Sequence, residues 1–117
     1  MGQLTTHVLD TAQGKPAAGM AIQLWRVAGD EVVLQQEAVT NEDGRVDGPL
    51  LDGDAFGAGT YQLIFAVGEY FAGQPVSVAE PAFLDVVTIR FSVANADDHY
   101  HVPLLISPWA YSTYRGR

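Results

Sequence analysis

The chain has no cysteine and few basic residues: 6 of its 117 residues are Lys or Arg, against 14 acidic ones, for a formal net charge of −8. Without cysteine it has no disulfide, no thiolate nucleophile and no cysteine metal ligand. The acidic balance argues against nucleic acid or an anionic membrane as a partner, because both carry charge of the same sign. Because basic residues are so scarce, arginines that lie close to histidines are candidates for binding a single anionic ligand.

Long apolar runs are also missing. No run is long enough to span a bilayer, and no basic stretch precedes an apolar one near the start, so we expect no membrane segment and no signal peptide. A cytoplasmic location is the corresponding expectation. No amphipathic helix of ordinary length is present either, and residues 68–73 leave room for about one or two helical turns. One domain over residues 1–117 is expected at this length.

Short β-forming runs separated by Gly, Pro, Asp and Asn make up most of the chain. Their number and spacing predict an all-β fold of about eight strands, arranged as two antiparallel sheets packed face to face. The runs lie at 4–10, 20–27, 31–40, 46–47, 61–67, 87–93, 99–106 and 109–115.

The run 99–106 alternates between two faces if it forms a strand. One face is uniformly apolar and predicts burial, whereas the other carries His99 and His101. Pro103 interrupts the run, which predicts an edge strand or a bulge. An exposed apolar edge invites pairing with another chain, so we also predict an oligomer assembled partly through the last two strands.

The histidines allow two chemical interpretations. His99 and His101 face the same way, and His7 is available as a third ligand, so a three-histidine metal site is one hypothesis. No acidic residue lies within the motif to orient a ligating ring, which counts against a metal. General acid–base catalysis is the other hypothesis, because histidine titrates near neutral pH. Arg45 follows the turn 41–44, and a guanidinium beside imidazoles suits a planar anion or amide.

Four segments carry a resemblance to a known family: LTTHVLDT at 4–11, NEDGR at 41–45, HYHVPLL at 99–105 and SPWAYSTYRG at 107–116. In this order and spacing they closely resemble the 5-hydroxyisourate hydrolases, the transthyretin-related enzymes of purine breakdown. The resemblance covers essentially the whole chain, and the last segment is its most specific part. Transthyretin itself, a hormone carrier, resembles this fold without the His, Arg and Tyr-Arg-Gly marks.

This resemblance implies a transthyretin-like sandwich with one short helix, assembled as a homotetramer that is a dimer of dimers, with active sites in the channel between dimers. It implies hydrolysis of 5-hydroxyisourate at a cyclic amide C–N bond, giving 2-oxo-4-hydroxy-4-carboxy-5-ureidoimidazoline in urate catabolism. Neither a metal nor an organic cofactor is implied. A transthyretin-like carrier of a small ligand, without catalysis, is the alternative.

The resemblance also implies a set of site residues. It carries no role to His99, and it leaves open which of two histidines is the general base. The chain departs from the family pattern at Arg117, where the family has serine. The implied residues are His7, Arg45, His101 and Tyr114 for catalysis, and His7, Arg45, Tyr114, Arg115 and Gly116 for binding the substrate.

Overall fold

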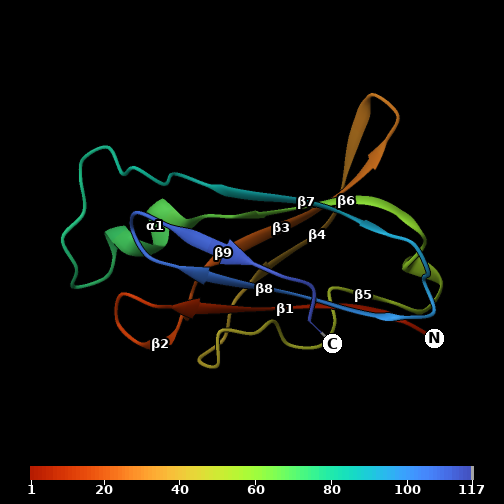
Figure 1. The fold of residues 1–117 in the computed structure, drawn as a ribbon, viewed down its shortest axis with the longest axis horizontal. Helices are drawn as coiled ribbons and strands as arrows, with labels where there is room; N and C mark the ends of the chain where they lie inside the picture. The colour runs from red at the N-terminus through yellow and green to blue at the C-terminus, as the bar shows by residue number, and fades with distance from the viewer. Residues whose placement is uncertain (117) are drawn as a thin grey trace.

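Two β-sheets pack face to face in the computed structural model, which describes residues 1–116 (Figure 1). One short α-helix and one 3₁₀ turn interrupt the strands. The elements in chain order are β1 (Gln3–Asp10), β2 (Lys15–Pro16), β3 (Ala21–Ala28), β4 (Glu31–Val39), β5 (Leu51–Asp52), η1 (Gly53–Ala55), β6 (Gly59–Phe65), α1 (Val67–Ala72), β7 (Val87–Val93), β8 (His99–Ile106) and β9 (Tyr111–Thr113).

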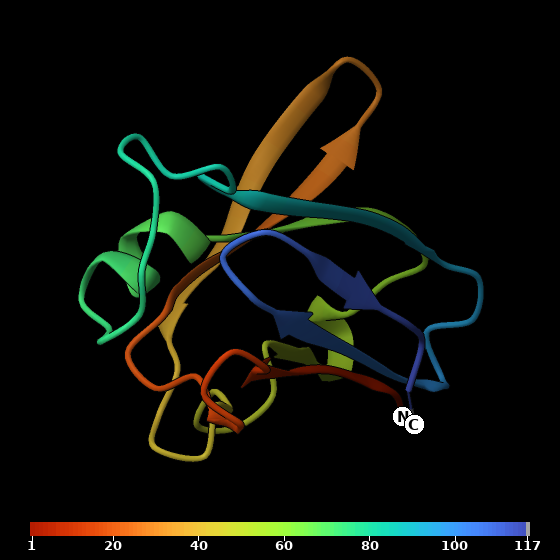
Figure 2. The ribbon, with the colours of Figure 1, turned by 60° about the vertical axis from the view of Figure 1, so that its left-hand side comes forward.

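The two sheets are built from different parts of the chain. The five-stranded sheet has the order β2-β1-β8-β9, with β5 also paired to β1, and the four-stranded sheet has the order β4-β3-β6-β7. The β3–β4 hairpin extends beyond the body of the sandwich, and α1 lies at one end of the sandwich (Figure 2). The predicted all-β sandwich with one short helix is confirmed. No helix within residues 1–116 has the length and apolar character needed to cross a membrane.

Alternation along the strands decides which side chains are buried. In β1 the residues Leu4, Thr6 and Val8 are buried, whereas the residues between them are partly exposed. In β8 four alternating residues face the same core. Burying apolar surface at about 25 cal/mol per Å² is the main favourable term of such packing. The buried residues of β8 that alternate in this way are Tyr100, Val102, Leu104 and Ile106.

The strands β1 and β8 run parallel, with eight paired positions from Gln3↔His99 to Asp10↔Ile106. Every other named pair of strands is antiparallel, so the prediction of antiparallel sheets is wrong for this one pair. The reason is topological: the whole four-stranded sheet lies between β1 and β8 in the chain. No hairpin therefore forces the two strands to run in opposite directions.

Pro103 lies in the interior of the five-stranded sheet, since β8 has β1 on one side and β9 on the other. The predicted edge position is therefore wrong. The carbonyls of His101 and Pro103 both accept bonds from the C-terminal segment, from the Gly116 N–H and from the Thr113 hydroxyl. The pairing of β8 with β9 ends at Leu104↔Thr113, so no residue of β9 is paired with Pro103. The proline thus lacks a donor where the ladder needs none.

Several strand boundaries also differ from expectation. The last strand is limited to β9 rather than 109–115, and Val67 begins α1 instead of ending a strand. The short strand expected at 46–47 is replaced by β5, and Lys15–Pro16 forms a strand outside the runs predicted from the sequence. A strand of two residues is too short to show an alternating hydrophobic pattern, so the sequence alone does not predict it. Such a strand is recognised only by the strand with which it pairs.

Replacing Leu104 with Ala should destabilise the fold by roughly 2–5 kcal/mol, because the fully buried side chain leaves a cavity between the sheets. Leu34 in β4 is 39% exposed and serves as a matched control, with an expected change within about 0.5 kcal/mol for Leu34→Ala. Urea denaturation at one fixed protein concentration measures both. Equal losses in the two variants would contradict this placement of the core.

Candidate active site

Two histidines project from the outer face of the five-stranded sheet. His7 and His101 are partly buried and alternate with the core residues of β1 and β8. The register pairs Thr5 with His101 and His7 with Pro103, so the two histidines are diagonal neighbours on one face. Strands spaced about 4.8 Å apart and a two-residue offset put their Cα atoms about 8 Å apart.

The turn 41–45 brings Arg45 to this face. The side-chain oxygen of Asn41 accepts hydrogen bonds from the backbone N–H groups of Asp43 and Arg45. Gly44 has φ +73°, and a Cβ there would lie 2.3 Å from the Val8 carbonyl oxygen, so only glycine fits. The Gly44 carbonyl accepts a 2.8 Å bond from the Val8 N–H.

This close approach lets Arg45 form an isolated antiparallel bridge with His7. The guanidinium is exposed, and within residues 1–116 it is paired with no carboxylate. A cation without a counter-ion beside two imidazoles favours an anion or a carbonyl oxygen as its ligand.

The C-terminal segment that follows β9, residues 114–116 (the tail), lies against the other side of His101. Gly116 donates a 2.7 Å backbone bond to the His101 carbonyl and forms a bridge with that residue. A Cβ on Gly116 would lie 2.9 Å from Cδ2 of the His101 ring. The glycine therefore allows the tail to touch the imidazole directly.

Arg115 faces away from the two histidines. Its guanidinium lies 4.0 Å above the ring of Tyr100, a core-facing residue, and donates a 3.0 Å bond to the His99 carbonyl. It also lies 3.9 Å from the Asp98 carboxylate. These contacts fasten the tail to β8, with the charge directed to the side of the sheet opposite the imidazoles.

Tyr114 directly precedes Arg115 in the chain and is 62% exposed. With Arg115 it borders an open cleft of about 250 Å³ between the tail and β7. Alternation along the tail puts Tyr114 on the same face as Gly116, whereas Arg115 lies on the other. The structure thus brings His7, Arg45, His101 and Gly116 together, with Tyr114 at the margin. Arg117 lies outside the described residues.

The electrostatic surroundings keep both imidazoles neutral near pH 7. Partial burial lowers the pKa of His7, the Arg45 charge lowers it further, and the Asp43 carbonyl and carboxylate oppose the shift. Burial also lowers the pKa of His101, with smaller contributions from Arg45, His7 and His99. A neutral imidazole has a lone pair that can accept a proton.

The hydrogen bonds of the rings go to separate partners. His7 Nε2 lies 2.9 Å from the Asp43 carbonyl oxygen, which only accepts, so Nε2 carries the proton and Nδ1 the lone pair. The His99 ring contacts the amide of Gln3. No group of three or more potential His, Cys, Asp or Glu metal ligands occurs within residues 1–116, so the arrangement required by the three-histidine metal hypothesis is not found there.

Sequence reasoning missed the residues that hold this site in place. The Asp43 carbonyl on His7 and the Gly44 contact with Val8 belong to the turn 41–45, which the sequence marks only as a turn. The Thr5 hydroxyl lies 2.8 Å from His101 Nδ1. The alternation that puts Thr5 on the same face as His7 was visible in the sequence, but the pairing of β1 with β8 was not.

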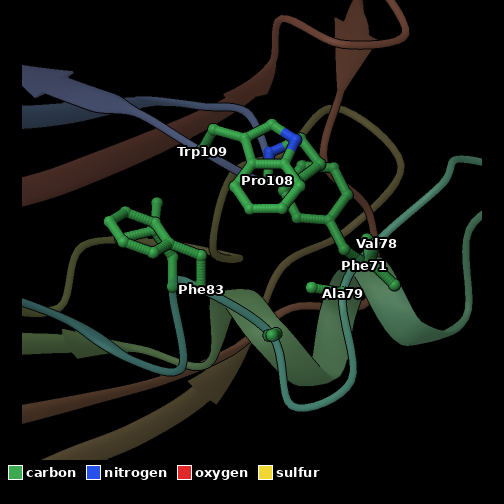
Figure 3. A pocket seen from close by; sticks show the side chains of 9 residues that line it. Phe71, Val78, Ala79, Phe83, Pro108 and Trp109 are labelled. Carbon is green, nitrogen blue, oxygen red and sulfur yellow. The ribbon is translucent and has the colours of Figure 1, made fainter.

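A separate hollow lies between α1 and the turn that follows β8 (Figure 3). Phe71 of the helix and Trp109 of the turn face it, and Trp109 lies beside Phe83 with ring centroids 5.9 Å apart. Its lining has no titratable side chain: Gly68, Phe71, Val78, Ala79, Ala82, Phe83, Leu84, Pro108 and Trp109. This hollow therefore offers no side chain for acid–base chemistry.

The chain matches one known protein family over almost its whole length. The model of the HIUase/Transthyretin family matches residues 4–116. The chain is 57% identical to 5-hydroxyisourate hydrolase 2 of Rhizobium meliloti over 115 residues, covering 98% of this chain and 96% of the relative.

Two solved structures have the same fold. Klebsiella pneumoniae 5-hydroxyisourate hydrolase superposes with a TM-score of 0.82 at 32% identity, over all of both chains. Sea bream transthyretin in complex with thyroxine superposes with a TM-score of 0.87 at 26% identity, over 97% of this chain and 94% of that one.

Replacing Arg45 with Ala should raise the pKa of both His7 and His101, because the guanidinium disfavours a second positive charge nearby. The measurement is an NMR titration of the ring carbon protons. Arg90→Ala is the matched control: Arg90 lies in β7 of the other sheet, where it binds Gln62, so its loss should move neither midpoint. Unchanged pKa midpoints of His7 and His101 in Arg45→Ala would show that the guanidinium lies too far from the two imidazoles to influence them.

Proposed function

The chain belongs to the HIUase/Transthyretin family, and we propose that it hydrolyses 5-hydroxyisourate on the outer face of its five-stranded sheet. The ring opens at a cyclic amide C–N bond to give 2-oxo-4-hydroxy-4-carboxy-5-ureidoimidazoline, a step of urate catabolism. Relatives named as this hydrolase match almost the full chain at 57% identity. The observation that carries the site assignment is the convergence of two neutral imidazoles and one guanidinium on a single face.

Amide hydrolysis needs a base for water, a group that stabilises the negative oxygen, and a geometry that orients the planar ring. In the proposed mechanism one neutral imidazole, that of His7 or His101, takes a proton from water as its oxygen attacks the amide carbonyl carbon. Arg45 binds the carbonyl edge and stabilises the charge that grows on oxygen in the tetrahedral state. The C–N bond then breaks, the departing nitrogen receives the proton, and the carbonyl carbon becomes the new carboxyl group.

The C-terminal segment has a positioning part in this scheme. Gly116 places the tail directly against His101, and Tyr114 lies beside it on the same face. We propose that Tyr114 orients the substrate ring and limits access of water from the wrong side. The contacts of Arg115 with Tyr100, His99 and Asp98 support a role in holding the tail in place rather than in binding the substrate directly.

The assembly we propose is a homotetramer, a dimer of dimers with sites in the channel between dimers, as family membership implies. The three residues of β9 are exposed at the edge of the five-stranded sheet, which supports pairing with a second copy there. Multi-angle light scattering would measure the molar mass directly, and the mass of a monomer would contradict a site in a channel between dimers.

We further propose that residues 1–117 act as one domain in the cytoplasm, which cell fractionation would test.

Absorbance decay of freshly generated 5-hydroxyisourate, with and without the protein, tests the function. The hydrolase accelerates the decay in proportion to protein concentration. A carrier of the transthyretin kind, whose sea bream member was solved with thyroxine, leaves the spontaneous rate unaltered. An unaltered rate of decay would contradict the hydrolase and favour the carrier function.

Arg45→Ala should lower turnover by about 10²–10³-fold, the usual effect of removing one group that stabilises an oxyanion. Arg45 lies on an exposed turn outside the core, so the variant should remain folded and keep the molar mass of the unmodified protein. The decay assay and light scattering together check this expectation. Undiminished turnover would remove Arg45 from the mechanism.

The pH dependence follows from the lowered pKa values of His7 and His101. A protonated imidazole has no lone pair, so kcat/KM should fall as pH decreases through the pKa, with a midpoint below about 6.5, the ordinary histidine value. Initial rates in overlapping buffers, corrected for spontaneous decay, give the midpoint. A midpoint above the ordinary value would contradict neutral imidazoles as the resting state.

A further inference from the structure

One hydrogen bond on the site face has no part in the mechanism so far. Thr5 and His101 are paired across β1 and β8, and the Thr5 hydroxyl lies 2.8 Å from Nδ1 of the imidazole. Both side chains are partly buried. The contact joins strands that are 96 residues apart in the chain, so it depends on the parallel register and on nothing local.

The opposite edge of the same ring is also occupied. Cδ2 of His101 faces Gly116, so closely that a Cβ on that glycine would lie 2.9 Å from it. Nδ1 and Cδ2 are the two ring atoms that flank Cγ, so the imidazole is held from both sides near its base. Nε2, at the far end of the ring, has no hydrogen-bond partner within residues 1–116 and is the nitrogen left for a ligand.

We propose that Thr5 is a positioning residue for the hydrolysis: its hydroxyl, opposite Gly116, fixes the orientation of the His101 ring so that Nε2 faces the substrate. The proposal rests on the proposed function. A hydrogen bond to one ring nitrogen fixes the orientation of an imidazole, and with it the direction of the other nitrogen. Threonine suits this role because its branched Cβ restricts χ1 in a strand and keeps the hydroxyl in one place.

Three groups near His101 influence its charge: Arg45 from the turn 41–45, His7 on β1 and His99 on β8 itself. All three disfavour the imidazolium. The Arg115 charge is directed to Tyr100 on the opposite side of the sheet. None of these groups holds the ring in one rotamer, and the Thr5 hydroxyl is the polar contact that does.

The test compares Thr5→Val with Thr5→Ser in the decay assay. Valine keeps the shape and strand preference but loses the hydroxyl. We expect kcat to fall by roughly 10- to 100-fold, the range measured for groups that orient metal-ligating histidines. KM should stay within about twofold, because in this proposal Thr5 acts through His101 and does not itself bind the substrate. Serine keeps the hydroxyl and should restore kcat to within about threefold.

Thr60→Val is the matched control. Thr60 lies in β6 of the other sheet, and its hydroxyl bonds the Ser92 hydroxyl at 3.0 Å. The substitution removes a strand hydroxyl of the same kind far from the site, so it should leave kcat and KM unchanged. A loss equal to that of Thr5→Val would point to a general effect on the sheets and would overturn the proposal.

Nitrogen-15 NMR of the His101 ring, well above its pKa, separates positioning from a merely structural role. The Nδ1 resonance should shift in Thr5→Val, because that nitrogen loses its hydrogen bond, and Thr5→Ser should keep the shift of the unmodified protein. Unchanged ring shifts, or wild-type kcat in Thr5→Val, would overturn the proposal. Thr5→Ala is read in the same way if the valine variant does not fold. Because the ring shifts require no turnover, a protein inactive on 5-hydroxyisourate would refute the proposed function and leave the test of Thr5 intact.

Discussion

The parallel pairing of β1 with β8 is the constraint on which the rest of this structure depends. Its register puts Thr5 beside His101 and His7 beside Pro103 on one face, and the core residues of both strands on the other. Because side chains alternate with a period of two, a slip of one residue would turn the histidines into the core and expose Leu4 and Tyr100. The burial that stabilises the sandwich therefore also sets the position of the site.

Side-chain hydrogen bonds within and beside this strand pair stabilise the same register. The Thr6 hydroxyl donates to the Val102 carbonyl inside the sandwich. At the end of β1 the buried Asp10 carboxylate accepts hydrogen bonds from Tyr70 of α1 and from both amide groups of Gln13. A buried carboxylate is tolerated because its lone pairs are satisfied. These bonds join the strand that carries His7 to the helix and to the adjoining loop.

The site itself combines groups with opposing requirements. In the proposed mechanism the imidazoles must be accessible to the substrate, yet they must remain neutral to accept a proton. Partial burial and the Arg45 charge both work toward neutrality. The same guanidinium, without a carboxylate partner within residues 1–116, remains available for a carbonyl or an anion. One cation therefore serves both needs, because it disfavours imidazolium and attracts developing negative charge.

The sequence by itself determined the alternation in 4–10 and 99–106, and with it the faces that carry His7 and His101, because the two-residue period is a local property. The motifs also pointed to the family. The tertiary structure alone decided that β1 and β8 run parallel, that Pro103 lies in an interior strand, that Arg115 faces Tyr100, and that Thr5 meets His101. Each of these depends on which distant segments pair and in which register. That choice is made by burying the apolar faces of the whole chain together, and no single segment records it.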